Sequence, residues 1–317
     1  MPELELVRRL YPEPLGAADA SRTRARTVLA ARIEARRPRR RRLALAAAAA
    51  AVALAAAALV GLGTRGDSTA SAATVALRKA AAVARAQPPL HRPGPGEYLY
   101  VKSVDAYLGT AVYSGNVSFS ALTPHVREVW LGPAGGRVRV RTGRAEFVSE
   151  RDRQTWIELG RPNLGDRGGD DMRVPPARPL DLPADPDALW DRLERDAQHG
   201  GSSVPDQMFT LVGDSLRETS ATPAQRAALY EVAARIPGVE LLGRVTDRSG
   251  RPGVAVARVD EANRIRYTLI FDPKTSALLG EEQAVVDGNA LGYPAGTVIG
   301  YATYVRSGIV DSLGRRP

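Results

Sequence analysis

The chain has 317 residues, 44% of them hydrophobic, and no cysteine, which excludes a disulfide framework, a thiolate metal site and a cysteine nucleophile. Its formal net charge of +9 is a basic excess of the kind found in nucleic-acid-binding proteins. However, residues 1–42 hold 12 Arg and 5 acidic residues, a net of +7, whereas residues 63–317 hold 32 basic and 30 acidic residues, a net of +2. The excess belongs to the N-terminal segment, and we expect no nucleic-acid partner.

Residues 43–62 form a run of 20 uncharged residues, made of 12 Ala, 5 Leu, 2 Val and Gly61. As a helix that rises about 1.5 Å per residue, this run covers about 30 Å, the hydrocarbon thickness of a bilayer. Ala and Leu favour helix, and the absence of a polar face argues against the alternative of a soluble Ala-rich helix. The run therefore predicts a transmembrane helix.

The charges around this run predict its direction. A cluster of Arg residues at 36–42 lies directly before it, with only Arg65 close after it. By the positive-inside rule, residues 1–42 are expected in the cytoplasm and residues 63–317 outside. A cleaved signal peptide is the competing interpretation, because Ala70-Ser71-Ala72 resembles a cleavage site. We favour an uncleaved signal anchor because the apolar run is too long for a signal peptide and 42 residues precede it. Whether cleavage follows Ala72 stays open.

The basic tail, residues 1–42, carries an apolar stripe of Ala25, Val28, Leu29 and Ile33 at helical spacing. So short a segment cannot bury a core of its own. The stripe is expected to lie on the membrane surface, where the Arg cluster would bind anionic lipid headgroups, or in the groove of a cytoplasmic protein. Disorder is the remaining alternative.

Beyond the span, residues 63–96 predict an Ala-rich helix around 72–86 and an extended Pro/Gly linker at 87–96. From residue 97 onward, apolar and polar residues alternate with the period of half-buried strands. The predicted strands are 98–104, 116–122, 126–131 and 137–142, and later 239–245, 254–259, 265–271, 277–286 and 298–305.

Helices are predicted between these two groups of strands. One contains Trp156, one covers 208–216, and two begin at Asp185-Pro186 and Thr222-Pro223, each an N-cap residue followed by Pro. Residues 161–178, rich in Gly, Pro and Asp, predict a disordered loop. Strands, helices and strands in this order indicate an α+β fold with an antiparallel sheet, and we place this extracytoplasmic domain at 97–317.

One sequence tag suggests catalysis. Gly213-Asp214-Ser215-Leu216 spells the tag of the GDSL esterases, in which the Ser follows the first strand and an Asp-x-x-His pair comes near the C-terminus. Here the tag lies in a predicted helix, and Asp196-x-x-His199 precedes it. Since a Ser without a base is a poor nucleophile, we predict no catalytic residue and no enzyme.

The histidines give no metal site. His91, His125 and His199 form none of the paired spacings that bind zinc, and no nucleotide-binding or EF-hand motif is present. We therefore expect no metal and no cofactor.

Two pairs of neighbouring carboxylates, Asp170/Asp171 and Glu281/Glu282, are expected to lie on solvated loops or strands. The tryptophans are expected to anchor hydrophobic cores rather than to bind ligands; they are Trp130, Trp156 and Trp190.

Several segments together resemble a family of uncharacterised actinobacterial single-pass membrane proteins. Besides the Arg run and the Ala-rich span, they are Glu3-Leu4-Glu5-Leu6-Val7-Arg8-Arg9-Leu10, Gly96-Glu97-Tyr98-Leu99-Tyr100, Arg127-Glu128-Val129-Trp130, Ile236-Pro237-Gly238-Val239 and Phe271-Asp272-Pro273-Lys274-Thr275. The resemblance implies the same membrane layout and no particular activity. The layout also resembles that of membrane-bound anti-sigma factors, without the His-x-x-x-Cys-x-x-Cys motif of their zinc-binding subclass.

The sequence thus predicts a signal-anchored protein of the cell envelope whose exported domain binds something without catalysis. A half-barrel sheet with a cavity for a lipid or a peptide would be one form of that domain. The alternatives are a membrane-anchored regulator of a cytoplasmic sigma factor and an unrecognised hydrolase.

Overall fold

The computed structural model describes residues 66–89, 92–113, 117–164, 170–176, 181–198, 202–217 and 221–317. The predicted tail at 1–42 and the predicted span at 43–62 lie outside these ranges. Within the described ranges, no helix is long and apolar enough to cross a bilayer. All described residues belong to one compact unit, Leu62–Pro317.

The strands form an antiparallel sheet in the order β6-β4-β3-β1-β11-β10-β9-β8-β7. Two short strands lie off this path: β2 pairs with the second half of β1, and β5 pairs with β2. The α+β fold with an antiparallel sheet is confirmed. The strands are β1 (Tyr98–Val112), β2 (Ser118–Leu122), β3 (His125–Gly132), β4 (Gly135–Thr142), β5 (Glu146–Phe147), β6 (Asp171–Val174), β7 (Glu240–Thr246), β8 (Pro252–Asp260), β9 (Ile265–Phe271), β10 (Leu278–Val285) and β11 (Val298–Val310).

The central pair, β1 and β11, is longer than the sequence predicts. β1 has 15 residues and β11 has 13, and they pair from Tyr98 opposite Val310 to Tyr107 opposite Gly300, with a bulge after Lys102. The extra length of β1 comes from its second half, where Gly109 pairs with Ala121 of β2. Small and polar residues there break the alternation on which the prediction depended.

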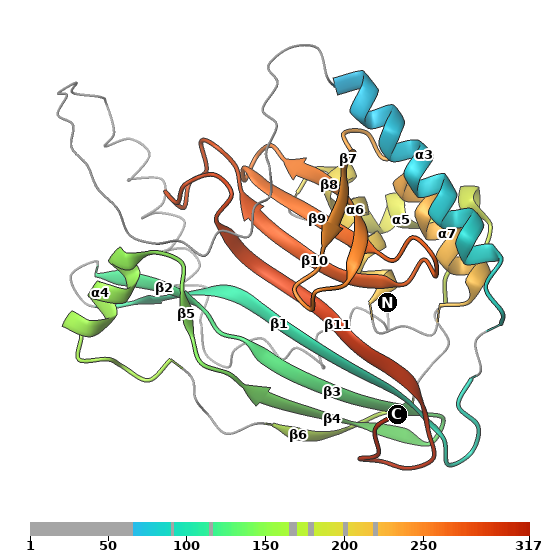
Figure 1. Ribbon diagram of the computed structural model, residues 1–317, viewed down its shortest axis with the longest axis horizontal. Helices are drawn as coiled ribbons and strands as arrows, with labels where there is room; N and C mark the ends of the chain where they lie inside the picture. The colour runs from blue at the N-terminus through green and yellow to red at the C-terminus, as the bar shows by residue number, and fades with distance from the viewer. Residues whose placement is uncertain are drawn as a thin grey trace. The chain divides into compact units, whose positions relative to one another are not determined.

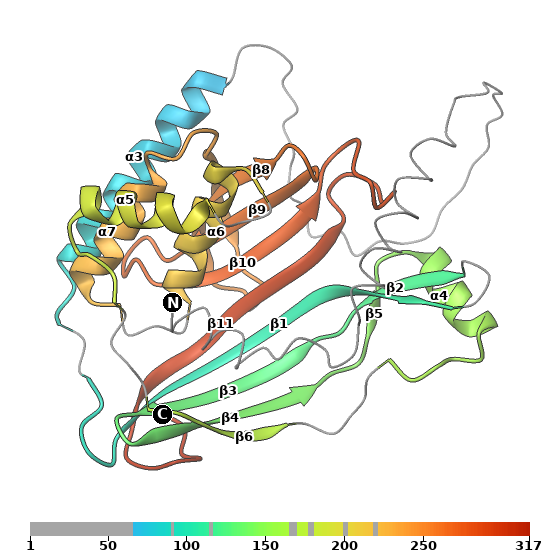
Figure 2. The same ribbon diagram turned by 180° about the vertical axis from the view of Figure 1, so that it is seen from behind.

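Four helices lie over the β7–β10 half of the sheet, as Figures 1 and 2 show from opposite sides: α3 (Gly66–Arg85), α5 (Pro186–Ala197), α6 (Val204–Leu216) and α7 (Pro223–Ala233). We call the face that they cover the inner face and the opposite one the outer face. Val256, Leu269 and Phe271 on the inner face pack with the helices in the main core. This core is the principal hydrophobic contribution to folding.

Helix α3 is part of this core. The Ala-rich helix forms as predicted, and its buried side chains follow the spacing of one helix face: Ala73, Leu77, Ala80, Ala81 and Ala84. The small side chains let α3 pack along α7. The composition of residues 63–96 predicts a segment set apart from the domain at 97–317. In the structure, α3 belongs to the same hydrophobic core as the helices and strands of that domain.

The helix starts follow capping rules. The Asp185 carboxylate accepts hydrogen bonds from the backbone of residues 187 and 188, and Thr222 forms a capping box with Gln225. Helix α6 begins four residues earlier than predicted, because Ser203 caps it and Pro205 stands within its first turn.

Strand β6 corrects the prediction of a disordered loop at 161–178. It pairs with β4, with Arg137 opposite Arg173 and Arg139 opposite Asp171. The Asp171 carboxylate accepts two hydrogen bonds from the Arg137 guanidinium. A Gly- and Asp-rich composition hid this short edge strand, whose stability depends on its partner.

At the other end of the sheet, α4 (Glu150–Glu158) packs on β2 and β5. The Trp156 ring lies 5.2 Å from the ring of Phe147, and Trp156 is half-buried there. Trp190 on α5 is also half-buried, whereas Trp130 is fully buried. Trp130 is therefore the clearest core anchor of the three.

The segment after β11 folds back over the outer face. The buried Glu128 carboxylate accepts hydrogen bonds from the Arg316 guanidinium, at 2.5 and 2.9 Å, and from the Tyr100 hydroxyl at 2.8 Å. The indole N–H of Trp130 donates to the backbone carbonyl of Arg315 at 2.6 Å. These bonds attach the segment firmly to β1 and β3.

Candidate functional site

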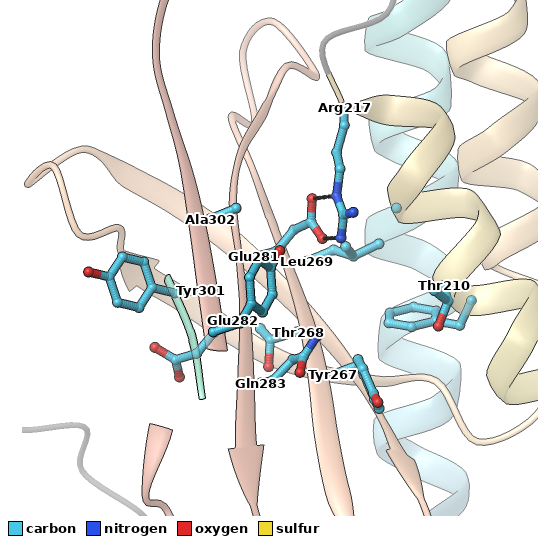
Figure 3. A pocket seen from close by; sticks show the side chains of 13 residues that line it. Thr210, Arg217, Tyr267, Thr268, Leu269, Glu281, Glu282, Gln283, Tyr301 and Ala302 are labelled. Atoms are coloured by element: carbon cyan, nitrogen blue, oxygen red, sulfur yellow. Dashed lines mark hydrogen bonds and ion pairs between the residues drawn. The ribbon is translucent and has the colours of Figure 1, made fainter. Parts of the chain in front are cut away.

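The last turn of α6 approaches the sheet at a glycine. A Cβ atom on Gly213 would come within 3.1 Å of the Leu269 side chain, so only glycine fits without displacing it. Arg217 caps the C-terminal end of α6. Figure 3 shows its side chain reaching over β10 to Glu281. Close packing of α6 thus positions a guanidinium over the middle of the sheet.

Arg217 is the centre of a group of ionisable residues on the inner face, the Arg217 cluster: Arg217, Asp214, Glu281 and Tyr304. The Nε atom of Arg217 donates to Glu281 Oε1 at 2.6 Å, and Nη2 contacts the other carboxylate oxygen. Nη1 lies 2.8 Å from Asp214 Oδ1, and the Tyr304 hydroxyl donates to Glu281 at 2.6 Å. Since the Glu281 side chain is only 11% exposed, its bonds with Arg217 are largely buried, charge-assisted bonds, which are the stronger kind, whereas the Asp214 side chain is 46% exposed.

Strand register extends this cluster across the inner face. Ala302 of β11 faces Glu281 of β10 on one side and Asp105 of β1 on the other. Asp105 in turn faces His125 of β3, and its Oδ2 atom lies 3.8 Å from His125 Nδ1. Directly opposed residues of neighbouring strands point to the same face. The four residues therefore form one row across four strands.

Burial raises the pKa of two carboxyl groups in this region. It raises the pKa of Asp105, against the lowering influence of His125, Arg127 and Arg217. It also raises the pKa of Asp214, although Arg217 acts in the opposite direction. The charged forms of both carboxyl groups are therefore disfavoured in the fold. Such shifts occur at functional sites and also in structural ion-pair networks.

The pocket beside the cluster is small. Its cavity volume is about 30 Å³, and its walls come from α6, β1, β9, β10 and β11, with Tyr107, Phe209, Tyr267 and Tyr301 among the lining residues (Figure 3). A buried water needs roughly 10–15 Å³, so the pocket holds about two waters. Sites for small organic ligands measure about 300–1,000 Å³. This pocket is not the cavity for a lipid or peptide that the sequence analysis hypothesised.

A larger recess lies over the helices. It has a volume of about 370 Å³ and is lined by Arg78, Pro186, Asp187, Glu231 and Arg235. Four of its five lining residues are of charged types, and Arg235 is paired with Asp187 at 2.6 Å. Because burying these charged groups against an acyl chain would be costly, the recess favours water and ions over such a chain.

The GDSL tag has a packing role at each of its four residues. Gly213 permits the close approach of α6, Asp214 pairs with the cluster, and Leu216 packs against the core. The Ser215 hydroxyl donates to the carbonyl of Leu211 at 2.7 Å, a common bond for a helical Ser. The tag therefore has a structural explanation.

Of the three histidines, the structure describes His125 alone. His125 begins β3, as predicted, and faces Asp105, whereas His91 and His199 lie outside the described residues. Among the residues that the structure describes, no group of three or more His, Asp or Glu could hold a metal ion.

Glu281 corrects the expectation that both carboxylate pairs are solvated. Glu282 points to the outer face, 3.8 Å from Arg248, while Glu281 points inward and is nearly buried. The sequence did hold a signal for this difference. Adjacent strand residues face opposite sides, so only one of the two could lie on the outer face.

Comparisons with known proteins give little further guidance. A scan of protein families finds no match to the sequence, and a search of curated proteins finds none either. Two solved structures, the Pseudomonas aeruginosa MucA/MucB complex and MucB with MucA(peri), are each 13% identical at a TM-score of 0.28 and cover 78% and 76% of this chain. The chain spans 58% and 56% of theirs, a little over half. A DUF1329 family protein from Desulfovibrio piger is 11% identical, with a TM-score of 0.21 over 75% of this chain and 92% of its own. TM-scores this far below 0.5 do not establish a shared fold.

Proposed function

We propose that this protein is a single-pass envelope protein that binds a partner outside the cell and passes the state of its exported domain to its membrane anchor through α3. Its N-terminal tail lies in the cytoplasm, residues 43–62 span the membrane, and the α+β domain is extracytoplasmic. The observation that carries the proposal is the docking of α3, the first described helix after the span, on the core of the domain.

The contact of α3 with the domain is extensive and specific. Leu77 and Ala81 are buried to 1% exposure or less. The Thr74 hydroxyl donates to the backbone carbonyl of Ala234 at 3.1 Å, and Arg85 pairs with Glu231 at 2.5 Å. A flexible tether would make none of these contacts. Movement of the domain therefore moves α3.

The connection between α3 and the proposed span is short. Only residues 63–65 separate the span from Gly66, where α3 begins. Even a fully extended chain of this length covers only about 10 Å. A change in the position or tilt of α3 would therefore be felt at the outer end of the membrane helix.

Topology is tested first. Reporter fusions after Arg42 and after Gly96 should show cytoplasmic and exported activity, respectively. Replacing Ala50 and Leu54 with Asp should block insertion, because each central Asp costs about 2.5–3.5 kcal/mol. Export of the first fusion or retention of the second would sink the proposal.

Coupling is tested by crosslinking from Leu29 in the tail of intact cells. The expected partner is either lipid or one cytoplasmic protein, a sigma factor being one candidate. We expect the adduct pattern to change when Ala81→Asp undocks α3 and to persist in the matched variant Val75→Asp, because Val75 is 67% exposed on the same helix. An unchanged pattern in Ala81→Asp, with the variant correctly inserted, would contradict the coupling.

The prediction that the chain is not an enzyme is tested separately. Turnover of a panel of esters and glycosides by the purified protein would contradict it, with Ser215→Ala as the control variant.

A further inference from the structure

On the outer face, one row of directly facing residues across the sheet consists entirely of charged side chains. Across the sheet, Arg306 of β11 faces Lys102 of β1, Lys102 faces Glu128 of β3, Glu128 faces Arg139 of β4, and Arg139 faces Asp171 of β6. In the Arg306–Lys102 pair, two like charges stand directly opposite each other. Such a pair destabilises a sheet, so the fold does not explain it.

A neighbouring row contains a second pair of like charges that face each other. Arg137 of β4 faces Trp130 on one side and Arg173 of β6 on the other. Arg141 lies on the same face of β4, four residues beyond Arg137. Among the described residues, the nearby carboxylates of Asp171 and Glu128 pair with other arginines. No described carboxylate lies within ion-pair distance of Lys102, Arg173 or Arg306.

Together these residues form the outer basic patch. The segment after β11 adds two more cations and one acid, since it crosses the same face near Arg137. The patch has eight cations against three carboxylates, a net of +5, although residues 63–317 as a whole carry only +2. Its cations are Lys102, Arg137, Arg139, Arg141, Arg173, Arg306, Arg315 and Arg316, and its acids are Glu128, Asp171 and Asp311.

The patch is broad and firmly supported. It extends over five strands, about 19 Å at about 4.8 Å per strand gap, and over about 13 Å along β4. The helices of the main core lie over the β7–β10 half of the sheet, beside the strands of the patch rather than behind them (Figures 1 and 2). Trp130 and Tyr100 are buried beneath it, with their rings 5.3 Å apart. It is a two-dimensional array of cations on a rigid base.

We propose that the outer basic patch docks the exported domain on anionic phospholipid headgroups at the bilayer surface. A two-dimensional array of cations complements a plane of phosphates better than it complements a linear polymer, which is held in a groove. Each cation near such a surface strengthens binding about fivefold. The proximity of the domain to the membrane rests on the proposed function; the charge pattern does not.

The test uses the full chain in vesicles of phosphatidylcholine, with or without phosphatidylglycerol. The chain has no cysteine, so Met172→Cys on edge strand β6, where the side chain is 41% exposed, gives a single dye site. The dye points to the inner face between Asp171 and Arg173, so it removes no cation. Energy transfer from it to a headgroup acceptor reports how close the strand that carries the edge of the patch lies to the bilayer. We expect stronger transfer with phosphatidylglycerol and a steady loss as salt screens the charges.

Two variants with the same change in net charge make the test specific. Lys102→Ser with Arg306→Ser should weaken docking about 25-fold, at about fivefold per cation. Lys79→Ser with Arg195→Ser removes one Lys and one Arg from exposed positions on α3 and α5 and should leave docking unchanged. The tail is identical in both. Because Lys102→Ser with Arg306→Ser relieves a like-charge pair, its unfolding midpoint should stay the same or rise.

The outcomes separate this proposal from the proposed function. Equal transfer in both lipid compositions, or equal losses in both variants, would overturn docking. Binding of a soluble glycerol-phosphate polymer without any lipid dependence would also overturn it and assign the patch to a polymer. Alkaline extraction of the same vesicles tests the anchor independently. If alkaline extraction releases the chain, while the chain still floats with anionic vesicles and this flotation depends on the patch, the result would support docking and contradict the membrane anchor.

Discussion

Arg217 at the end of α6 and Glu281 in β10 are 64 residues apart in sequence, and their side chains are joined by two hydrogen bonds. The pair connects the helical layer to the sheet directly, and Asp214 and Tyr304 extend it with one contact on each side. It also brings the cation of one element to the carboxylate of another that would be costly to bury alone.

Breaking this pair should destabilise the domain. Arg217→Met leaves the nearly buried Glu281 without its main partner, and we expect the free energy of unfolding to fall by about 2 kcal/mol, discounted for partial exposure of the guanidinium. The control is Arg153→Met, whose pair with Glu150 is exposed on both sides and should have little effect. Urea unfolding measures both. Equal losses of unfolding free energy in the two variants would show that the buried pair stabilises the domain no more than the exposed pair.

Asp105→Asn should stabilise the domain at neutral pH. Burial raises the pKa of Asp105 in the fold. This group therefore favours the fold only when protonated, below its unfolded pKa of about 3.9, and that contribution is lost as the pH rises through the folded pKa. The gain from Asp105→Asn, measured by urea unfolding, should be present at pH 7 and should disappear near pH 3. A gain that does not depend on pH would contradict the assignment.

Glu128 should show the opposite dependence. Hydrogen bonds from Arg316 hold the pKa of Glu128 below its ordinary value, with burial acting against them. The stabilisation is therefore present above the unfolded pKa of about 4.3 and is lost as the pH falls through the folded pKa. The stability difference between the wild type and Arg316→Met should be large at pH 7 and should shrink below pH 4.

The neighbouring arginine supplies the control for that experiment. Arg315 contacts Trp130 through its backbone carbonyl, and its side chain lies 3.7 Å from the exposed Asp311. Arg315→Met should therefore leave both the stability and its pH dependence nearly unchanged. If both variants behaved alike, the Arg316–Glu128 bond would not be the source of the effect.

Helix α3 gives the simplest test of the packing. Leu77→Ala removes a side chain that is 1% exposed, and we expect a loss of about 2–4 kcal/mol in unfolding free energy. Val75→Ala, at a position 67% exposed, should change stability by less than about 0.5 kcal/mol. Thermal or urea unfolding of the full chain in detergent measures both. A small effect of Leu77→Ala would mean that α3 folds apart from the domain.

Local signals in the sequence predicted most of the described elements. The N-cap and Pro pairs at Asp185 and Thr222 marked two helices correctly, and alternation marked the positions of most strands. Both signals depend on neighbouring residues alone. Strand β6 escaped because its four residues are specified by pairing with β4, which composition does not reveal.

The inner-face row could not be predicted in the same way. Glu281, Asp105 and Arg217 come together only through strand order and the position of α6, which are properties of the whole fold. The outer basic patch did leave a trace, because Arg137, Arg139 and Arg141 alternate along β4 and must share one face.

The pairing of β1 with β11 sets the order in which this domain can be completed. These strands lie side by side at the centre of the sheet, although Tyr98 and its partner Val310 stand at opposite ends of the domain sequence. In the proposed topology, the N-terminal end of this domain would leave the membrane first, so β1 would emerge long before its central partner. Contacts of such long sequence separation form late and slow folding. If the domain is exported as proposed, β1 and β3 would expose unpaired edges until β11 arrives, and a chaperone that shields them would raise the yield of native protein.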